Sequence, residues 1–295
     1  MDFWARRSIL TNILGIVLFA ATGGLLLLGA ARLPFLQTTP ERWVLAVYYA
    51  LITAATLLVT RLYDGMPAAW AGLGLHRWTV RELLTGLALG LAMALVAWAP
   101  IAAVGGVNAG EGWNSRDLGY FIPTMILLAA GEEVLFRGYL FQRLVEIIGP
   151  VAAVLGSALL FALGHYGNPN ATILSTAIIF IGGIFFALCY IRTGSLWLPI
   201  GAHAAWNVLL GKVLGLPVSG LDFGGSLLRT GITSPVALTG GDFGPEGGAA
   251  GIIALAFGIW VLLRLPAITF SPYVYASVFR AFARRTGKTV RTGGS

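Results

Sequence analysis

The stretch that decides the fold is Ile126–Phe141, ILLAAGEEVLFRGYLF, in which three charged residues interrupt an otherwise apolar run. A charged side chain at the middle of a membrane helix costs roughly 2.5–3.5 kcal/mol on insertion scales, so such residues usually face a partner or a cavity. Glu133 and Arg137 are four residues apart and can pair on one helix face. Glu132 lies about 100° around the helix and has no partner in this segment. A lone ion pair that fixes helix packing is the alternative to a functional site.

The composition indicates a membrane protein. The 295-residue chain is 57% hydrophobic and 11% charged, with a mean hydropathy of +0.83, whereas a soluble domain carries about 25% charged residues. The net charge of +7 is explained by basic residues that flank apolar segments, so lipid headgroups are the expected partners and nucleic acid is not. The single cysteine, Cys189, excludes an intrachain disulfide.

The apolar segments predict an all-α, polytopic transmembrane bundle in which about eight helices enclose a central polar cavity. A spanning helix needs about 20 apolar residues. The expected helices are Ile9–Ala31, Trp43–Thr60, Leu83–Val104, Phe121–Leu144, Val151–Gly164, Ala171–Ile191, Leu198–Leu214 and Gly248–Leu265. The fifth and seventh are short, so we expect them to be tilted, broken or re-entrant. We expect a single integral membrane domain over residues 1–295.

The distribution of basic residues predicts a multi-pass protein of the cell membrane with both termini in the cytoplasm. That topology places thirteen Lys and Arg residues inside and five outside, in agreement with the positive-inside rule. Residues 266–295 would form a basic cytoplasmic tail. The glycine-rich stretch before the last helix, residues 215–248, is either an ordinary extramembrane loop or a lid over a binding site.

Further polar residues interrupt the later helices. His165 ends the fifth apolar segment, and His203 and Asn207 lie four residues apart on one face of the seventh. A carboxylate in a site of low dielectric constant can act as a general base on water, and histidine and asparagine can donate hydrogen bonds to an oxyanion. Glu132, His165, His203 and Asn207 therefore make a plausible hydrolytic set. Glu132, His165 and His203 could alternatively hold one zinc ion.

Three motifs, taken together, resemble a known family. They are Glu132-Glu133-x-x-x-Arg137, Phe161-x-x-x-His165 and His203-x-x-x-Asn207. Their order and placement resemble the CAAX-protease and bacteriocin-processing family of intramembrane proteases, the Abi group, with the core of the resemblance over residues 118–210.

The resemblance implies roles for the motif residues. Glu132 would activate water with the help of His165. Glu133 and Arg137 would shape and neutralise the site, while His203 and Asn207 would stabilise the oxyanion. Phe161 is expected to be a packing residue.

The resemblance further implies an endopeptidase that acts on a membrane-associated peptide or protein, with prenylated substrates left open. It leaves open whether a metal such as Zn²⁺ takes part, and we favour a metal-independent mechanism because asparagine is a poor metal ligand. Two other functions remain open: a catalytically silent immunity or scaffold protein of the same fold, and a small transporter that relays protons. Against the transporter, the sequence shows no internal repeat.

Overall fold

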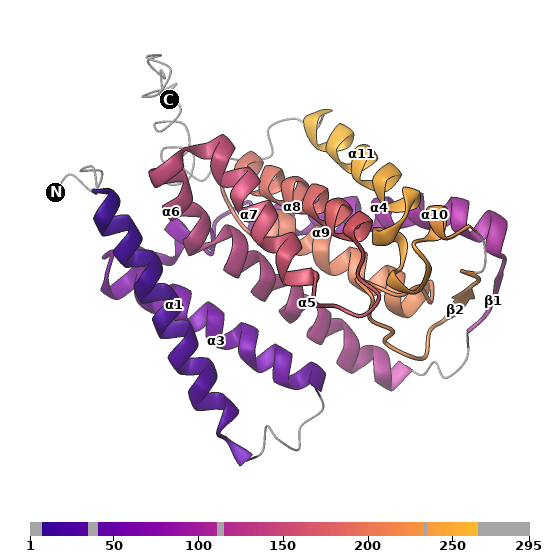
Figure 1. Cartoon of the computed structure of the whole chain (residues 1–295), viewed down its shortest axis with the longest axis horizontal. Helices are drawn as coiled ribbons and strands as arrows, with labels where there is room; N and C mark the ends of the chain where they lie inside the picture. Colours follow the sequence, from indigo (N-terminus) through magenta and orange to yellow (C-terminus); the bar gives the residue numbers. More distant parts are fainter. Residues whose placement is uncertain (1–7, 35–40, 111–114, 233–234, 265–295) are drawn as a thin grey trace.

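A computed structural model describes residues 8–34, 41–110, 115–232 and 235–264 (Figure 1). The chain is a helical bundle, as the sequence predicts. The longer helices are α1 (Ile9–Ala31), α3 (Glu41–Leu62), α4 (Thr79–Gly105), α5 (Ser115–Arg137), α6 (Tyr139–Ile148), α7 (Pro150–His165), α8 (Ile173–Thr193), α9 (Trp197–Val208) and α11 (Ala249–Arg264). The predicted tail, residues 266–295, lies outside the described residues.

The structure differs from the sequence prediction in the fourth apolar segment. One helix was expected over Phe121–Leu144, but the chain breaks at Gly138, whose φ and ψ of −77° and −118° are not helical. A Cβ at Gly138 would overlap the carbonyl oxygen of Val134, so the tight turn requires glycine. The break ends α5 at Arg137 and lets α6 take its own direction.

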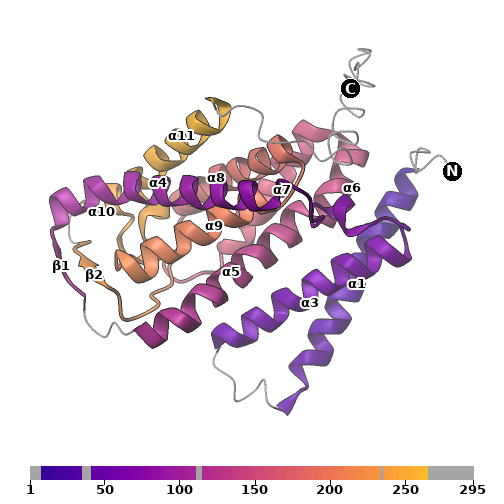
Figure 2. The same ribbon diagram turned by 180° about the vertical axis from the view of Figure 1, so that it is seen from behind.

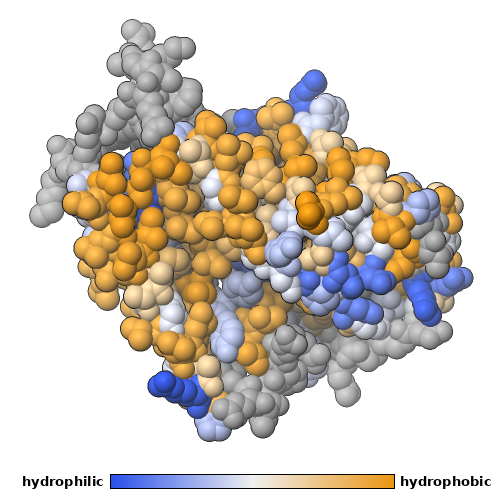
Figure 3. Space-filling model, in the orientation of Figure 1, coloured by the Kyte–Doolittle hydropathy of each residue, from blue (hydrophilic) through white to orange (hydrophobic). Residues whose placement is uncertain are grey.

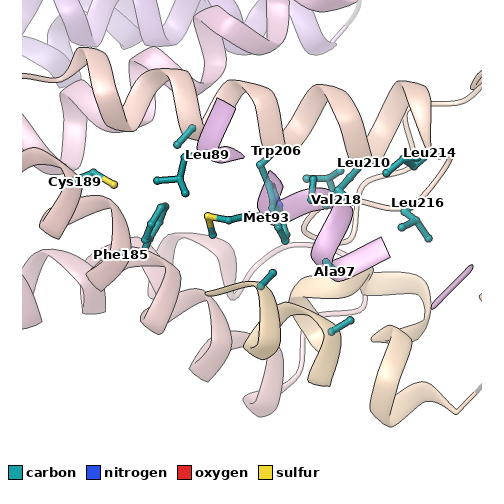
Figure 4. Packing of buried hydrophobic residues seen from close by; sticks show 14 of the residues in the cluster. Leu89, Met93, Ala97, Phe185, Cys189, Trp206, Leu210, Leu214, Leu216 and Val218 are labelled. Carbon is teal, nitrogen blue, oxygen red and sulfur yellow. The ribbon is translucent and has the colours of Figure 1, made fainter. Parts of the chain in front are cut away.

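Helices α4 and α9 form the centre of the bundle, and glycine lets them approach closely. A Cβ at Gly86 or Gly90 of α4 would overlap the backbone of α9 at Leu198 or Ala202. Such small residues allow two membrane helices to pack backbone to backbone. Beside this seam lies the largest apolar cluster, in which the side chain of Trp206 lies next to Met93 of α4 (Figure 4).

Helices α1 and α3 lie side by side at one side of the molecule (Figures 1 and 2). A buried arginine of α6, Arg143, joins them to the bundle. It donates to Asn12 Oδ1 of α1 at 2.6 Å and pairs with Asp64 Oδ1 at 3.2 Å and Glu146 Oε2 at 2.9 Å. Its guanidinium carbon lies 4.4 Å from the centre of the Trp70 ring. Its ion pairs and hydrogen bonds offset the cost of burying the charge, so the side chain links three elements of the fold.

The glycine-rich stretch after α9 is folded against the bundle. A π-helical turn (Leu209–Val213) follows α9, and β2 (Leu228–Thr230) pairs antiparallel with β1 (Val107–Ala109). The short helix α10 (Val236–Thr239) and two 3-10 turns, Gly241–Phe243 and Pro245–Gly247, lead into α11.

The surface of the molecule fits a membrane. Among the described residues, five helical segments are long and apolar enough to cross one: Ile9–Ala31, Val44–Leu62, Thr79–Gly105, Gly119–Ile148 and Ile173–Thr193. Hydrophobic residues cover much of the face drawn in Figure 3, and hydrophilic residues gather toward the end that carries the strands and loops. The chain is therefore a multi-pass membrane protein.

Candidate functional site

The site is built on a fully buried ion pair within α5. Arg137 Nη1 lies 3.1 Å and 3.2 Å from the two carboxylate oxygens of Glu133, and both side chains are 0% exposed. Arg137 Nη2 donates to the carbonyl oxygen of Gly183 in α8 at 3.1 Å. The pair predicted from the four-residue spacing is present, and it joins α5 to α8 as well as neutralising two charges.

His203 of α9 extends this network. Its Nδ1 lies 2.9 Å from Glu133 Oε1, and its ring stacks on Phe186 of α8 with centroids 4.6 Å apart and an interplanar angle of 23°. The close approach to Glu133 assigns a hydrogen to Nδ1. The Nε2 atom of His203 is thereby turned toward Glu132.

His165 is the last residue of α7 and reaches the same place from another direction. Its Nδ1 lies 2.8 Å from the carbonyl oxygen of Phe161, one helical turn earlier. A carbonyl oxygen only accepts, so the hydrogen is on Nδ1 here too, and Nε2 points to Glu132.

Glu132 is the residue on which these side chains converge. Tyr49 of α3 donates to its Oε1 at 3.2 Å. Its Oε2 lies 3.8 Å from His165 Nε2 and 3.7 Å from His203 Nε2, and accepts no hydrogen bond from the described residues. These separations are too long for direct hydrogen bonds, which leaves the three atoms free to contact a water molecule beside them. The Glu132 side chain is 17% exposed and that of Glu133 is 0% exposed, so solvent reaches only the first of the two glutamates.

The aromatic ring of Phe161 fills the space between these groups. Its centroid is 4.4 Å from the guanidinium carbon of Arg137, 4.5 Å from the ring of His165 and 6.1 Å from that of His203. The ring thus packs against both histidines and gives the buried arginine a cation–π contact. This position fits the packing role expected for Phe161.

Asn207 lies one turn after His203 on α9 and is half-buried. Its side chain makes no hydrogen bond to the described residues, so the amide remains available as a donor beside His203. Of the six residues singled out in the sequence, the structure joins five through contacts and places Asn207 on the same helix face as His203.

The convergence has a simple geometrical basis. Straight helices that span the bilayer would hold His165 and His203 at different depths. Helix α7 has only 16 residues and α9 only 12, and α5 ends at Arg137, the last residue of its motif. These short helices bring His165, at the end of α7, level with the middle of α9, while the tilted or re-entrant course expected for the two segments stays a prediction.

A cavity of about 40 Å³ lies against His165 and His203, which is room for a few water molecules. Its remaining wall is mostly apolar and comes from α4, α8, α9 and α11. Ser219 and Glu246, from the stretch between α9 and α11, also line it. Glu246 Oε1 accepts from Trp206 Nε1 at 2.8 Å, and Oε2 accepts from Ser219 Oγ at 2.6 Å.

Sequence reasoning missed two of these residues. Glu246 is a lone acidic residue in a glycine-rich stretch, and its position just before an apolar helix was the only signal. Tyr49 had no signal, because it lies in an apolar helix 83 residues away from Glu132. The glycine-rich stretch of residues 215–248, expected to be either an ordinary extramembrane loop or a lid, thus supplies part of the wall of the cavity.

No set of three His, Cys, Asp or Glu side chains in the described ranges is arranged to hold a metal ion. Glu132, His165 and His203, the set that would bind Zn²⁺, instead leave Oε2 3.7–3.8 Å from each Nε2. Ligand atoms around one tetrahedral zinc ion at bond lengths of about 2.0–2.2 Å lie about 3.3–3.6 Å apart. The observed separations are therefore slightly longer than those of a formed zinc site.

Comparison with known proteins supports the resemblance seen in the motifs. Residues 114–209, about a third of the chain, match the model of the Rce1-like family, described as type II CAAX prenyl endopeptidase Rce1-like. No curated protein and no solved structure matches the chain significantly.

The matched segment begins just before α5 and ends just after α9. It contains all three motifs and the three helices, α5, α7 and α9, that carry the glutamates and histidines. The resemblance to the CAAX-protease and bacteriocin-processing family is confirmed: residues 114–209 are a Rce1-like segment of that family, set within a multi-pass membrane protein.

Proposed function

We propose that this chain is an intramembrane endopeptidase that hydrolyses a peptide bond of a membrane-associated protein by water activated at Glu132. The observation that carries the proposal is the convergence of Glu132 Oε2 with Nε2 of His165 and of His203 at 3.7–3.8 Å. The matched family is one of CAAX prenyl endopeptidases, so a prenylated carboxyl-terminal peptide is the first substrate to test.

The numbers of hydrogen-bond donors and acceptors, together with the net charge, support one protonation state for the site. Glu132 Oε2 and the two Nε2 atoms can all accept, but one water donates only two hydrogens. For a single water in contact with all three atoms, we propose that one ring carries a second proton. His203 suits this better than His165, because its Nδ1 faces the carboxylate of Glu133 and that of His165 faces a neutral carbonyl. Two carboxylates, the Arg137 guanidinium and one imidazolium then sum to zero charge.

The reaction follows from these positions. A water bound between Glu132 and His165 gives one proton to Glu132 Oε2 as its oxygen attacks the carbonyl carbon of the substrate. The oxygen of that carbonyl becomes an oxyanion, which accepts hydrogen bonds from His203 Nε2–H and the Asn207 amide. The carbon–nitrogen bond then breaks, and Glu132 returns the proton to the leaving nitrogen. Glu133 and Arg137 take no proton and hold His203 in place.

The test is cleavage of a fluorogenic, farnesylated peptide ending in Cys, two aliphatic residues and one further residue, by purified protein in detergent. We expect Glu132→Gln to lower the cleavage rate by about 10²–10⁴-fold, because general-base catalysis is lost at constant side-chain volume. Asp242→Asn is the matched control, since Asp242 is an exposed carboxylate. Its rate should equal that of the wild type. The mechanism predicts that a chelator of divalent metals leaves cleavage intact.

Other outcomes are equally informative. Wild-type cleavage that persists in Glu132→Gln would refute the mechanism. If the chelator abolishes cleavage and added zinc restores it, a metal ion takes part in catalysis. Absence of cleavage across farnesylated and unprenylated peptides, with a properly folded protein, would favour the silent scaffold function.

A further inference from the structure

Each reacting group of the proposed site is held by a neighbour at the atom that faces away from the water. His165 is held at Nδ1 by the Phe161 carbonyl oxygen, and His203 at Nδ1 by Glu133. Glu132 is the third group, and a corresponding support for it has to come from outside α5. The side chain that meets this requirement is Tyr49 of α3, which no motif includes.

The contact between Tyr49 and Glu132 is specific to one carboxylate oxygen. The hydroxyl donates to Oε1 at 3.2 Å, while Oε2 receives no hydrogen bond from the described residues and faces the histidines. A carboxylate bound at one oxygen loses most of its rotational freedom about its terminal torsion. The hydrogen bond thus orients the carboxylate so that its other oxygen faces the water.

The packing of α3 on α5 is built around the same pair. A Cβ at Gly131, the residue before Glu132, would overlap the side chain of Tyr49. The absence of a side chain at Gly131 lets Tyr49 lie against α5 close enough to reach Glu132. On α3 itself, Thr53 Oγ1 donates to the carbonyl oxygen of Tyr49 at 2.9 Å.

We infer that Tyr49 is a positioning residue of the hydrolytic site, which holds the Glu132 carboxylate so that Oε2 points at the water. The inference rests on the proposed function, because it assigns Tyr49 a role only through Glu132. It also gives α3, which lies outside the matched segment, a part in the site.

The test compares Tyr49→Phe with Tyr48→Phe. The first removes the hydroxyl and keeps the ring, and the second makes the same change at the neighbouring tyrosine, for which no contact with Glu132 is present. With the farnesylated peptide as probe, we expect kcat to fall about 10-fold in Tyr49→Phe, with KM and the thermal unfolding midpoint unchanged. Tyr48→Phe should match the wild type in all three.

Infrared spectroscopy gives a second readout that needs no substrate. The difference spectrum between the wild type and Glu132→Gln isolates the carboxyl bands of Glu132. These bands should shift in Tyr49→Phe and stay in place in Tyr48→Phe, because only the former loses a hydrogen bond to the carboxylate. A structural role alone would change the unfolding midpoint and leave the bands unshifted.

The outcomes separate this inference from the proposed function. An inactive Glu132→Gln together with a fully active Tyr49→Phe whose carboxyl bands are unshifted would overturn the inference and leave the proposed function standing. A fully active Glu132→Gln would overturn the proposed function, and the role of Tyr49 with it. If the wild type cleaves no probe, the bands still decide whether Tyr49 holds Glu132.

Discussion

Replacing Arg137 with methionine tests how much of the site depends on the buried ion pair. The methionine side chain is of similar length and fits the apolar surroundings of Phe161, but it leaves the Glu133 carboxylate without the guanidinium. At 3.1 Å and an effective dielectric constant of about 20, the attraction between two unit charges is about 5 kcal/mol. Removing one partner of such a pair costs about 3–5 kcal/mol in measured cases.

We therefore expect Arg137→Met to lower the free energy of unfolding by about 3–5 kcal/mol, measured by titration of the purified protein from mild detergent into SDS. Arg137→Lys keeps the charge and loses the hydrogen bond to the Gly183 carbonyl, so its loss should be smaller, about 1–2 kcal/mol. Arg264→Met, at an exposed arginine, is the control and should change stability by less than about 0.5 kcal/mol.

A double variant separates charge from packing. Glu133→Gln combined with Arg137→Met removes both charges, so it should be more stable than Arg137→Met alone by about 1 kcal/mol or more. If the double variant loses as much unfolding free energy as Glu133→Gln and Arg137→Met lose in sum, the two side chains are not energetically coupled. Equal stability of Arg137→Met and wild type would likewise refute the reasoning.

Two further predictions concern the packing around the site. Gly90→Ala should lower the free energy of unfolding by about 2–3 kcal/mol, because the added Cβ would overlap the Ala202 backbone. Gly156→Ala is the control: this helical glycine has open space around it, so the substitution should not be destabilising. Glu246→Gln should increase proteolytic cleavage of the stretch between α9 and α11 several-fold, because an amide nitrogen would replace one of the oxygens that accept from Trp206 and Ser219. Unchanged proteolysis would show that this stretch is held by its apolar contacts.

The long helices could be predicted well from the sequence, because a continuous apolar run of about 20 residues has few other stable forms in a membrane. The prediction for Ile9–Ala31 agrees with α1 at both ends. The break at Gly138 was not foreseen, since an isolated glycine is common in membrane helices and only its contact with the Val134 carbonyl explains the turn.

The contacts of the site also differ in how far the sequence predicts them. The pairing of Glu133 with Arg137 depends on helical spacing and was predictable, whereas the contacts of Glu132 with Tyr49 and of Glu246 with Trp206 depend on how distant segments pack. Local periodicity carries no information on such contacts. The roles of the motif residues in catalysis, the cytoplasmic placement of the termini and the single-domain assignment remain predictions.

The shortness of α7 has a consequence for the surrounding lipid. Its 16 residues give an axial length of about 24 Å, less than the roughly 30 Å of a typical hydrocarbon core. Its outer face is apolar and exposed: Val151, Leu155, Leu159 and Leu163 are 47–68% accessible. Acyl chains beside α7 must therefore compress by about 6 Å, a hydrophobic mismatch that draws the water boundary inward. Because His165 ends this helix, thinning of the bilayer at that end would leave less hydrocarbon for water and a polar peptide backbone to cross on the way to the site.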